Sequence, residues 1–187
     1  MALLPIVRAG HPVLRQTAQP IGDPQDPQLR RLVDDMVETM EEAGGVGLAA
    51  PQVGVPLRLV IFMVPEGRAG QDPEDTPLPL GALLNPVITP LGDEMVEAWE
   101  GCLSLPGLRG MVPRARRIRY TGLDLDGNPI DRTVSGFHAR VVQHECDHLD
   151  GRLYPSRMTD LSTLGFVDEY ARAAEAATRA PEVTDDA

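Results

Sequence analysis

Apolar residues recur with helical spacing in the segment that follows Asp26-Pro27. An acidic cap residue before a proline is typical of a helix start, and the apolar positions then repeat every three to four residues. These positions are Leu29, Leu32, Val33, Met36 and Met40. Glycine commonly ends a helix, so the pattern predicts a helix from Pro27 to just before Gly44-Gly45.

The middle of the chain consists of short apolar runs separated by glycine and proline, which favours strands. Strands are predicted over residues 57–64, 83–89 and 94–99. Residues 116–134 alternate around the turn signal Asp126-Gly127, which predicts a hairpin. The segment 65–81 is rich in proline, glycine and acidic residues and is expected to be a surface loop.

Helical patterns return towards the end of the chain, over residues 137–150, ending at Gly151, and over residues 161–179. Short strands between helices predict an α+β fold with mostly antiparallel sheets around the helix at 137–150. We expect a single domain over residues 1–180. Residues 181–187 form an acidic tail that is expected to be disordered.

The composition excludes several kinds of chemistry. The net charge is −11, which disfavours binding to nucleic acid. All 17 basic residues are arginine, which excludes a lysine Schiff base and a P-loop lysine. Two cysteines, Cys102 and Cys146, are too few for a disulfide scaffold. Neither a membrane span nor a signal peptide is evident, so we expect a cytoplasmic protein.

The segment His144-Glu145-Cys146-Asp147-His148 is typical of a metal site. Histidines four positions apart lie on one face of a helix, where both imidazoles can reach one ion. The intervening Glu145 lies close enough to exchange protons with water at the ion, as in metal-assisted hydrolysis. The alternative is an exposed helix that contains these letters by chance.

A third ligand is required for a catalytic site of this kind. Cys102, in Glu100-Gly101-Cys102-Leu103-Ser104, is the main candidate, and its alternative is a buried structural thiol. Cys146 lies on the other side of the helix from the two histidines and is expected to be a core thiol. His11 and His138 are weaker candidates.

A segment of small residues, Gly45 to Gln52, allows a second backbone to approach closely. Gln52 offers an amide that can donate to an oxyanion, although a tightly packed strand would show the same pattern. Together with residues 100–104 and 143–148, this segment resembles the three signature motifs of peptide deformylases, in the order of that family. The resemblance extends from about Pro5 to Arg157.

The resemblance implies specific roles. Cys102, His144 and His148 would bind one divalent metal, Fe²⁺ in the native enzyme, with Zn²⁺, Ni²⁺ or Co²⁺ as possible substitutes. Glu145 would act as general base and then general acid, and the oxyanion would be stabilised by Gln52 and the backbone N–H of Leu103. The substrates would be N-formylmethionyl nascent peptides.

The substrate site implied by the resemblance has three parts. The peptide would lie along Gly45 and Gly47, and its methionine side chain would contact Val46, Phe137, Arg140 and Val141. Glu100 and Arg109 match residues near the mouth of the pocket. We further expect Leu48 and Cys102 to wall a cramped site that admits a formyl group and excludes longer acyl groups.

Other interpretations remain open from the sequence. A general zinc protease or a non-catalytic protein with a structural metal would share the His-Glu-x-x-His pattern. Trp99 and the loop 72–79 depart from the family, which affects the outer pocket. The acidic C-terminal region disfavours ribosome docking. The run Arg114, Arg116, Arg117 and Arg119 could bind RNA, but a solvated face is favoured, with Arg114 pairing to Asp147.

Overall fold

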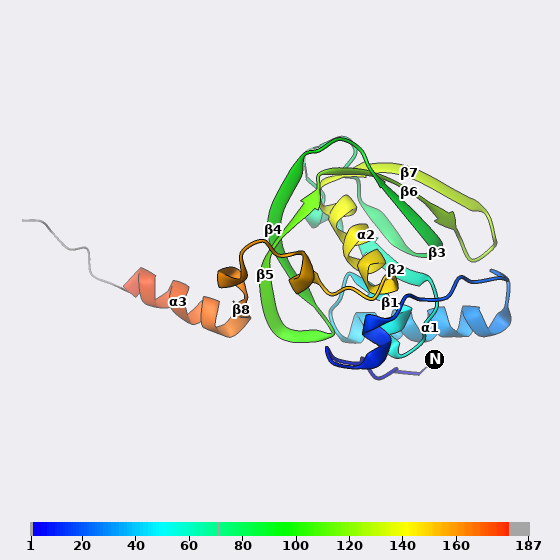
Figure 1. Cartoon of the computed structure of the whole chain (residues 1–187), viewed down its shortest axis with the longest axis horizontal. Helices are drawn as coiled ribbons and strands as arrows, with labels where there is room; N and C mark the ends of the chain where they lie inside the picture. The colour runs from blue at the N-terminus through cyan, green and yellow to red at the C-terminus, as the bar shows by residue number, and fades with distance from the viewer. Residues whose placement is uncertain (1, 71, 180–187) are drawn as a thin grey trace, which may run out of the picture.

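Two antiparallel sheets surround one central helix, α2 (Gly136–Leu149), in the computed structural model, which describes residues 2–70 and 72–179. Helix α1 (Pro27–Glu42) packs on the larger sheet, and α3 (Val167–Arg179) extends away from the body of the protein (Figure 1). The α+β class predicted from the sequence is confirmed. The expected tail, 181–187, lies outside the described residues.

The larger sheet has five strands in the order β1-β2-β3-β6-β7, and the smaller has three in the order β4-β5-β8. The strands of the larger sheet are β1 (Gly47–Ala49), β2 (Leu59–Val64), β3 (Leu78–Pro90), β6 (Arg117–Leu123) and β7 (Pro129–Ser135). Those of the smaller sheet are β4 (Met95–Cys102), β5 (Leu105–Ala115) and β8 (Gly165–Phe166). The 3₁₀ turns are η1 (Pro12–Arg15), η2 (Ala50–Val53), η3 (Glu66–Arg68), η4 (Tyr154–Arg157) and η5 (Leu161–Thr163).

Strand β2 is covered on both faces, which explains its uninterrupted apolar sequence. Val60 and Phe62 belong to the core shared with α2, whereas Leu59 and Ile61 belong to the core shared with α1. Met36 of α1 is fully buried in the second core. Burying a side chain of this size contributes roughly 1.5–3 kcal/mol, so the two cores fix α1 and α2 on opposite faces of one sheet.

The expected surface loop 65–81 ends earlier than predicted, because β3 already begins at Leu78. Leu78 pairs with Val64 and Gly81 with Phe62. Hydrogen bonding to a buried neighbour outweighs the proline and glycine composition of this stretch. The predicted hairpin at 116–134 is confirmed as β6 and β7, and Gly127 takes a positive φ in the turn between them.

Strand β5 was not predicted from the sequence. Its proline and glycine residues, Pro106, Gly107, Gly110 and Pro113, conceal the strand pattern. Its partner β4 determines the conformation through pairing from Met95–Ala115 to Gly101–Arg109. The resulting hairpin places Cys102 directly beside α2.

The predicted third helix, 161–179, starts later than expected. Gly165 and Phe166 form β8 and pair with Arg109 and Leu108 of β5, so α3 begins at Val167. None of the helices in the described ranges combines the length and apolar character that a membrane span needs.

Candidate active site

Helix α2 presents both histidines of the sequence motif on one face. The ring centroids of His144 and His148 are 5.2 Å apart. His144 is 9% exposed and His148 is 1% exposed, because α2 lies between the two sheets. Two imidazoles in this position can bind one ion away from bulk solvent.

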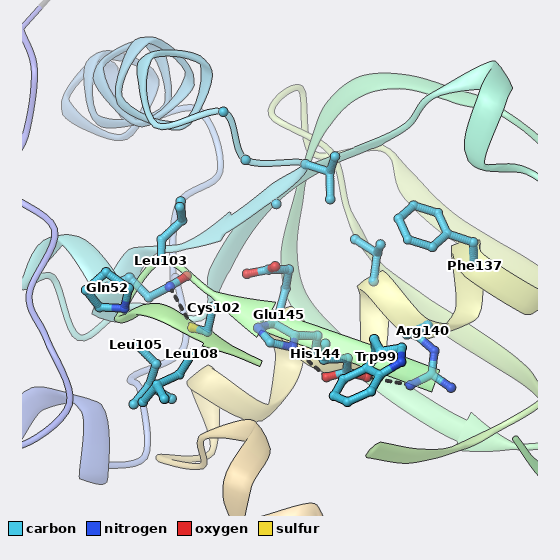
Figure 2. A pocket seen from close by; sticks show the side chains of 18 of the residues that line it. Gln52, Trp99, Cys102, Leu103, Leu105, Leu108, Phe137, Arg140, His144 and Glu145 are labelled. Carbon is cyan, nitrogen blue, oxygen red and sulfur yellow. Dashed lines mark hydrogen bonds and ion pairs between the residues drawn. The ribbon is translucent and has the colours of Figure 1, made fainter. Parts of the chain in front are cut away.

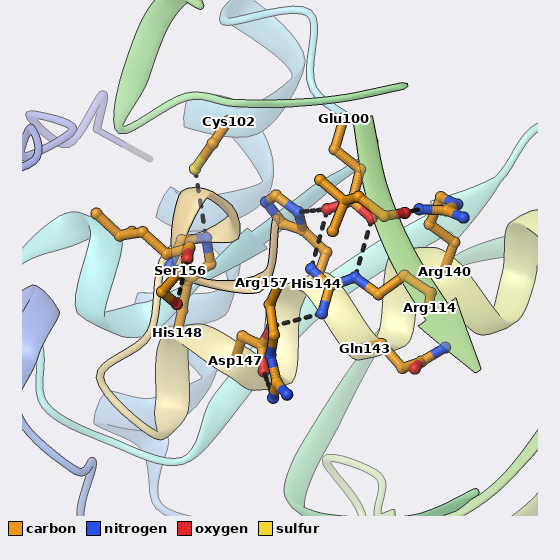
Figure 3. Close-up of polar contacts among 12 residues, drawn as sticks. Glu100, Cys102, Arg114, Arg140, Gln143, His144, Asp147, His148, Ser156 and Arg157 are labelled. Atoms are coloured by element: carbon orange, nitrogen blue, oxygen red, sulfur yellow. Dashed lines mark hydrogen bonds and ion pairs between the residues drawn. The ribbon is translucent and has the colours of Figure 1, made fainter. Parts of the chain in front are cut away.

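Cys102 at the end of β4 completes a group of three donors with His144 and His148. The ligand atoms of these residues all lie within 4.8 Å of one another. The distance between Sγ of Cys102 and Nε2 of His148 is 3.4 Å (Figure 3). Tetrahedral ligation by sulfur at 2.3 Å and nitrogen at 2.0–2.1 Å would separate these atoms by about 3.5 Å, so the donors fit a divalent ion.

Glu100 orients His144. Its carboxylate lies 2.8 Å from Nδ1 of His144, which leaves Nε2 available as the ligand atom. Arg114 donates to both oxygens of Glu100 at 2.9 Å, and Arg140 donates to it at 2.7 Å. Burial opposes ionisation, yet the contacts with His144 and Arg114 hold the pKa of Glu100 well below its usual range. The residue lines the cavity as expected, and its contact with His144 is an additional feature that the sequence did not reveal.

Asp147 links α2 to strand β5 and to the 3₁₀ turn η4. It accepts a hydrogen bond from Arg114 at 2.5 Å and from Arg157 at 2.6 Å. The pairing of Arg114 with Asp147 predicted from the sequence is therefore confirmed. Burial of Asp147 and Arg114 makes the network rigid, because neither ion has solvent as an alternative partner.

Glu145 lines the same cavity as Cys102 and His144, and its Oε2 is available to accept a proton. The side chain is 5% exposed, and Oε2 has no hydrogen-bond partner among the described residues. Burial raises the pKa of Glu145 to about 7. A carboxyl group with a pKa near neutrality can both accept and return a proton. A Cβ on Gly47 would lie 2.4 Å from Oε1 of Glu145, which explains the need for glycine at that position.

The amide of Gln52 points towards the same centre (Figure 2). Its Oε1 accepts from the backbone N–H of Ala49 at 2.9 Å, which fixes the orientation of the amide. Its Nε2 then lies 3.5 Å from Sγ of Cys102 and 3.2 Å from Oγ of Ser104. Gln52 is 2% exposed, so its N–H groups are aimed at the site and shielded from water.

A cavity of about 430 Å³ opens over these residues. Of the expected substrate residues, those lining it are Gly45, Val46, Gly47, Glu100, Phe137, Arg140 and Val141. Further lining residues that the sequence did not indicate include Arg68, Leu105, Pro106 and Leu108. Leu105, Pro106 and Leu108 lie on β5, so prediction of that strand would have identified them. No local sequence pattern marks Arg68 as a residue of the cavity.

Leu48 and Arg109 do not line this cavity. The Leu48 side chain is fully buried in the core beneath α1, so the expectation that Leu48 walls the site is wrong. The Arg109 guanidinium instead lies 4.1 Å from the ring centroid of Trp99, which does line the cavity. Trp99 also packs edge-on against Tyr170 of α3, with ring centroids 5.0 Å apart.

The two histidines have opposite shifts in pKa. Burial opposes the charged form of His144, but its contacts with Cys102 and Glu100 raise its pKa. Burial, together with the charge on His144, lowers the pKa of His148. Ligand imidazoles must be neutral, so a raised pKa of His144 makes protons compete with a metal ion for this residue.

The other candidate ligands lie elsewhere. Cys146 is buried in the core on the sheet side of α2, and burial raises the pKa of its thiol. His138 lies 3.1 Å from the Tyr120 hydroxyl, and His11 accepts from the backbone N–H of Val13.

The run of arginines from Arg114 to Arg119 is engaged in ion pairs. Arg114 pairs with Glu100 and Asp147, Arg116 with Glu94 and Asp72, Arg117 with Glu74, and Arg119 with Asp131.

Comparison with known proteins identifies a consistent set of relatives. Residues 3–163 match the family model described as polypeptide deformylase. "Peptide deformylase 1" of Bordetella pertussis is 56% identical over 163 residues, covering 87% of this chain and 92% of the relative. The crystal structure of peptide deformylase from Ehrlichia chaffeensis has a TM-score of 0.79 at 32% identity, covering 97% of this chain and 100% of that one. The Met-Ala-Ser bound crystal structure of class I type b peptide deformylase from Acinetobacter baumannii has a TM-score of 0.75 at 36% identity. The match covers 84% of this chain and 99% of that one.

Proposed function

This chain belongs to the polypeptide deformylase family of metal-dependent hydrolases, and we propose that it uses Glu145 and the donors Cys102, His144 and His148 to remove the formyl group from N-formylmethionyl peptides. The observation that carries this proposal is the free Oε2 of Glu145 beside three clustered ligand atoms, facing a cavity. A structural metal site would need neither a free buried carboxylate nor a cavity.

One thiolate and two neutral imidazoles suit a divalent first-row metal. We propose Fe²⁺ as the native ion, with Zn²⁺, Ni²⁺ or Co²⁺ able to replace it. A divalent ion held there would supply Lewis-acid chemistry, lowering the pKa of water and polarising a carbonyl group. One thiolate and two neutral imidazoles would leave such a site with a net positive charge, which still favours ionisation of water.

Glu145 accepts a proton from the attacking water, whose oxygen forms a bond to the formyl carbon. Gln52 Nε2 and the backbone N–H of Leu103 donate to the oxygen on which negative charge develops. One such donor is worth roughly 2.7–4 kcal/mol in the transition state. Glu145 then gives its proton to the departing amine as the C–N bond breaks. The products are formate and a peptide with a free N-terminal methionine.

The peptide itself would bind along β1. This strand is at the edge of the larger sheet, so its outer side is unpaired among the described strands. An extended peptide can add to such an edge through backbone hydrogen bonds. The methionine side chain would then enter the cavity between Val46 and the α2 residues Phe137, Arg140 and Val141.

The formyl group is selected by lack of space beside Glu145. A Cβ on Gly47 would lie 2.4 Å from that carboxylate, and Cys102 lines the same cavity. An acetyl group would need room for one additional methyl. These two residues take the role first expected of Leu48 and Cys102.

The test is release of formate from formyl-Met-Ala-Ser by the purified, metal-loaded protein. We expect turnover of this peptide and at least tenfold slower turnover of acetyl-Met-Ala-Ser. Cleavage of internal peptide bonds would indicate a general protease. Full metal binding without turnover of either peptide would indicate a structural site.

We place this activity in the cytoplasm, where nascent chains emerge from the ribosome. The charge of α3 does not favour docking of this helix on the ribosome. Arg172 of α3 is engaged by Asp168 and Glu169, so its charge is compensated within the helix.

A further inference from the structure

The first turn of α2 is capped by a residue far away in the sequence. Asp75 is 5% exposed, and its two carboxylate oxygens accept hydrogen bonds from the backbone N–H groups of Phe137 and His138, each at 3.0 Å. The backbone N–H of Gly70 donates to the same carboxylate at 2.8 Å. Asp75 and Phe137 are separated by 62 positions in the chain. A carboxylate at this end of a helix is favoured by both the free N–H groups and the helix dipole.

The local sequence leaves room for this distant cap. Ser135, at the usual cap position, makes no side-chain hydrogen bond to the helix. Gly136 has φ +57°, and a Cβ there would lie 2.2 Å from Oδ2 of Asp75. Only glycine suits this first position of the helix. Its backbone takes a positive φ, and Asp75 occupies the space that a side chain would fill.

Arg68 lies in the same connection between β2 and β3 as Asp75, and it makes a second contact at the cavity. The Arg68 guanidinium lies 5.0 Å from the ring centroid of Phe137, and both residues line the cavity. Glu74 pairs with Arg117 at 2.5 Å, which anchors the connection next to Asp75 on β6. Phe137 is thus held at its backbone by Asp75 and at its ring by Arg68.

We propose that Asp75 is a positioning residue, and Arg68 a specificity-determining residue, of the pocket that takes the methionine side chain. This inference rests on the proposed function. Together the two residues fix Phe137 as a wall of that pocket, so they determine which side chain the pocket accepts.

Different turns of α2 carry the pocket wall and the residues of the reaction, which supports this assignment. Its first turns carry the wall residues Phe137, Arg140 and Val141, and its later turns carry His144 and Glu145. Loss of the cap frays the first turn of a helix and leaves later turns intact. His144 is held by Glu100 of β4, whose two oxygens also accept from Arg114 of β5. Removal of the Asp75 contacts should therefore move the pocket wall and spare the chemistry.

The first experiment compares Asp75→Asn and Asp75→Ala with the wild type, using formyl-Met-Ala-Ser and formyl-Ala-Ala-Ser. Asp26→Asn is the matched control, because Asp26 caps α1 through the N–H of Gln28 at 2.8 Å and does not line the cavity. Bound Co²⁺ and its absorption spectrum report on the metal site. We expect KM for the methionine peptide to rise about tenfold and the methionine-to-alanine ratio of kcat/KM to fall about tenfold. The kcat for the methionine peptide and the Co²⁺ spectrum should stay as in the wild type, and Asp26→Asn should leave the ratio unchanged.

The inference is overturned if the Asp75 variants keep the wild-type ratio, or if they lose Co²⁺ and kcat together. The second outcome would make Asp75 a support of the metal helix as a whole. If Asp75→Ala does not fold, Asp75→Asn decides, since it keeps the shape and one acceptor oxygen.

Arg68 provides a test that leaves the cap intact. Arg68→Met should lower the methionine-to-alanine ratio about threefold, the effect of losing one exposed cation–π contact, and Arg68→Lys should restore part of it. Arg31→Met, an exposed change on α1, is the control. An unchanged ratio in Arg68→Met would remove Arg68 from the inference. Absence of formate release by the wild type would instead reject the proposed function itself.

Discussion

The Glu100 carboxylate lies 2.8 Å from Nδ1 of His144, although the two residues are 44 positions apart. This contact fixes which imidazole nitrogen faces Cys102. Both residues are buried, and Glu100 is also bound by Arg114 and Arg140. The metal centre is therefore oriented by β4 and β5 as much as by the helix that carries the histidines.

Glu100→Gln should weaken metal binding or activity by about 10- to 100-fold, the usual effect of losing a carboxylate that orients a ligand histidine. The neutral amide can occupy the same space, but it compensates Arg114 and Arg140 poorly. Competition with a chelator of known affinity measures the change. Glu94→Gln is the control, because it removes an exposed pair with Arg116 that is worth at most about 1 kcal/mol. Equal metal affinity in the two variants would contradict the role of Glu100.

Glu145→Gln should retain metal and lose activity by about 10²- to 10⁴-fold, because the proton carrier is removed while the ligands remain. Formate release together with metal analysis provides the measurement. Turnover within tenfold of the wild type would show that another group carries the proton.

The same variant makes a prediction about stability in the metal-free protein. Burial raises the pKa of Glu145 to about 7, above the value of about 4.3 for an exposed glutamate. Between these values the folded state binds more protons than the unfolded state, so this group lowers stability as pH rises. Glu145→Gln should therefore reduce the loss of thermal stability between pH 5 and pH 8, measured in the presence of a chelator. An identical pH profile for wild type and variant would show that Glu145 ionises normally.

The sequence was sufficient where the signal is local. The cap at Asp26, the turn at Asp126-Gly127 and the spacing of His144 and His148 each involve neighbouring residues, and the structure has the corresponding helices and hairpin. Recognition of three motifs together also indicated Cys102, which no local pattern identifies as a ligand.

Contacts between distant segments were not predictable from the sequence. The glycines and prolines of β5 adopt a strand because β4 pairs with them. Gly165-Phe166 forms β8 because Leu108 and Arg109 are available as partners. In such cases tertiary pairing outweighs local preference. Asp75, in a stretch that reads as an acidic loop, caps α2 for the same reason.

Cys102→Ser should weaken metal binding, because a serine hydroxyl is a poor ligand where a thiolate is expected. Cys146→Ser is the matched control, since Cys146 is also buried but lies in the core on the sheet side of α2. Metal content after dialysis should fall only in Cys102→Ser. Unchanged affinity in that variant would require another third ligand.

Oxidation should separate the two cysteines further. A thiolate that is bound to a redox-active ion at a cavity is exposed to oxidants, whereas a buried neutral thiol is not. Burial raises the pKa of Cys146, which keeps it in the unreactive form. With ferrous iron bound, activity should therefore decay in air, and Cys146→Ser should decay at the wild-type rate. Zinc does not change oxidation state, so the zinc form should keep its activity, at a lower initial level. The measurement is formate release against time in air for both metal forms and the variant. Equal decay of the iron and zinc forms would contradict oxidation at the metal, and protection by Cys146→Ser would identify Cys146 as the sensitive thiol.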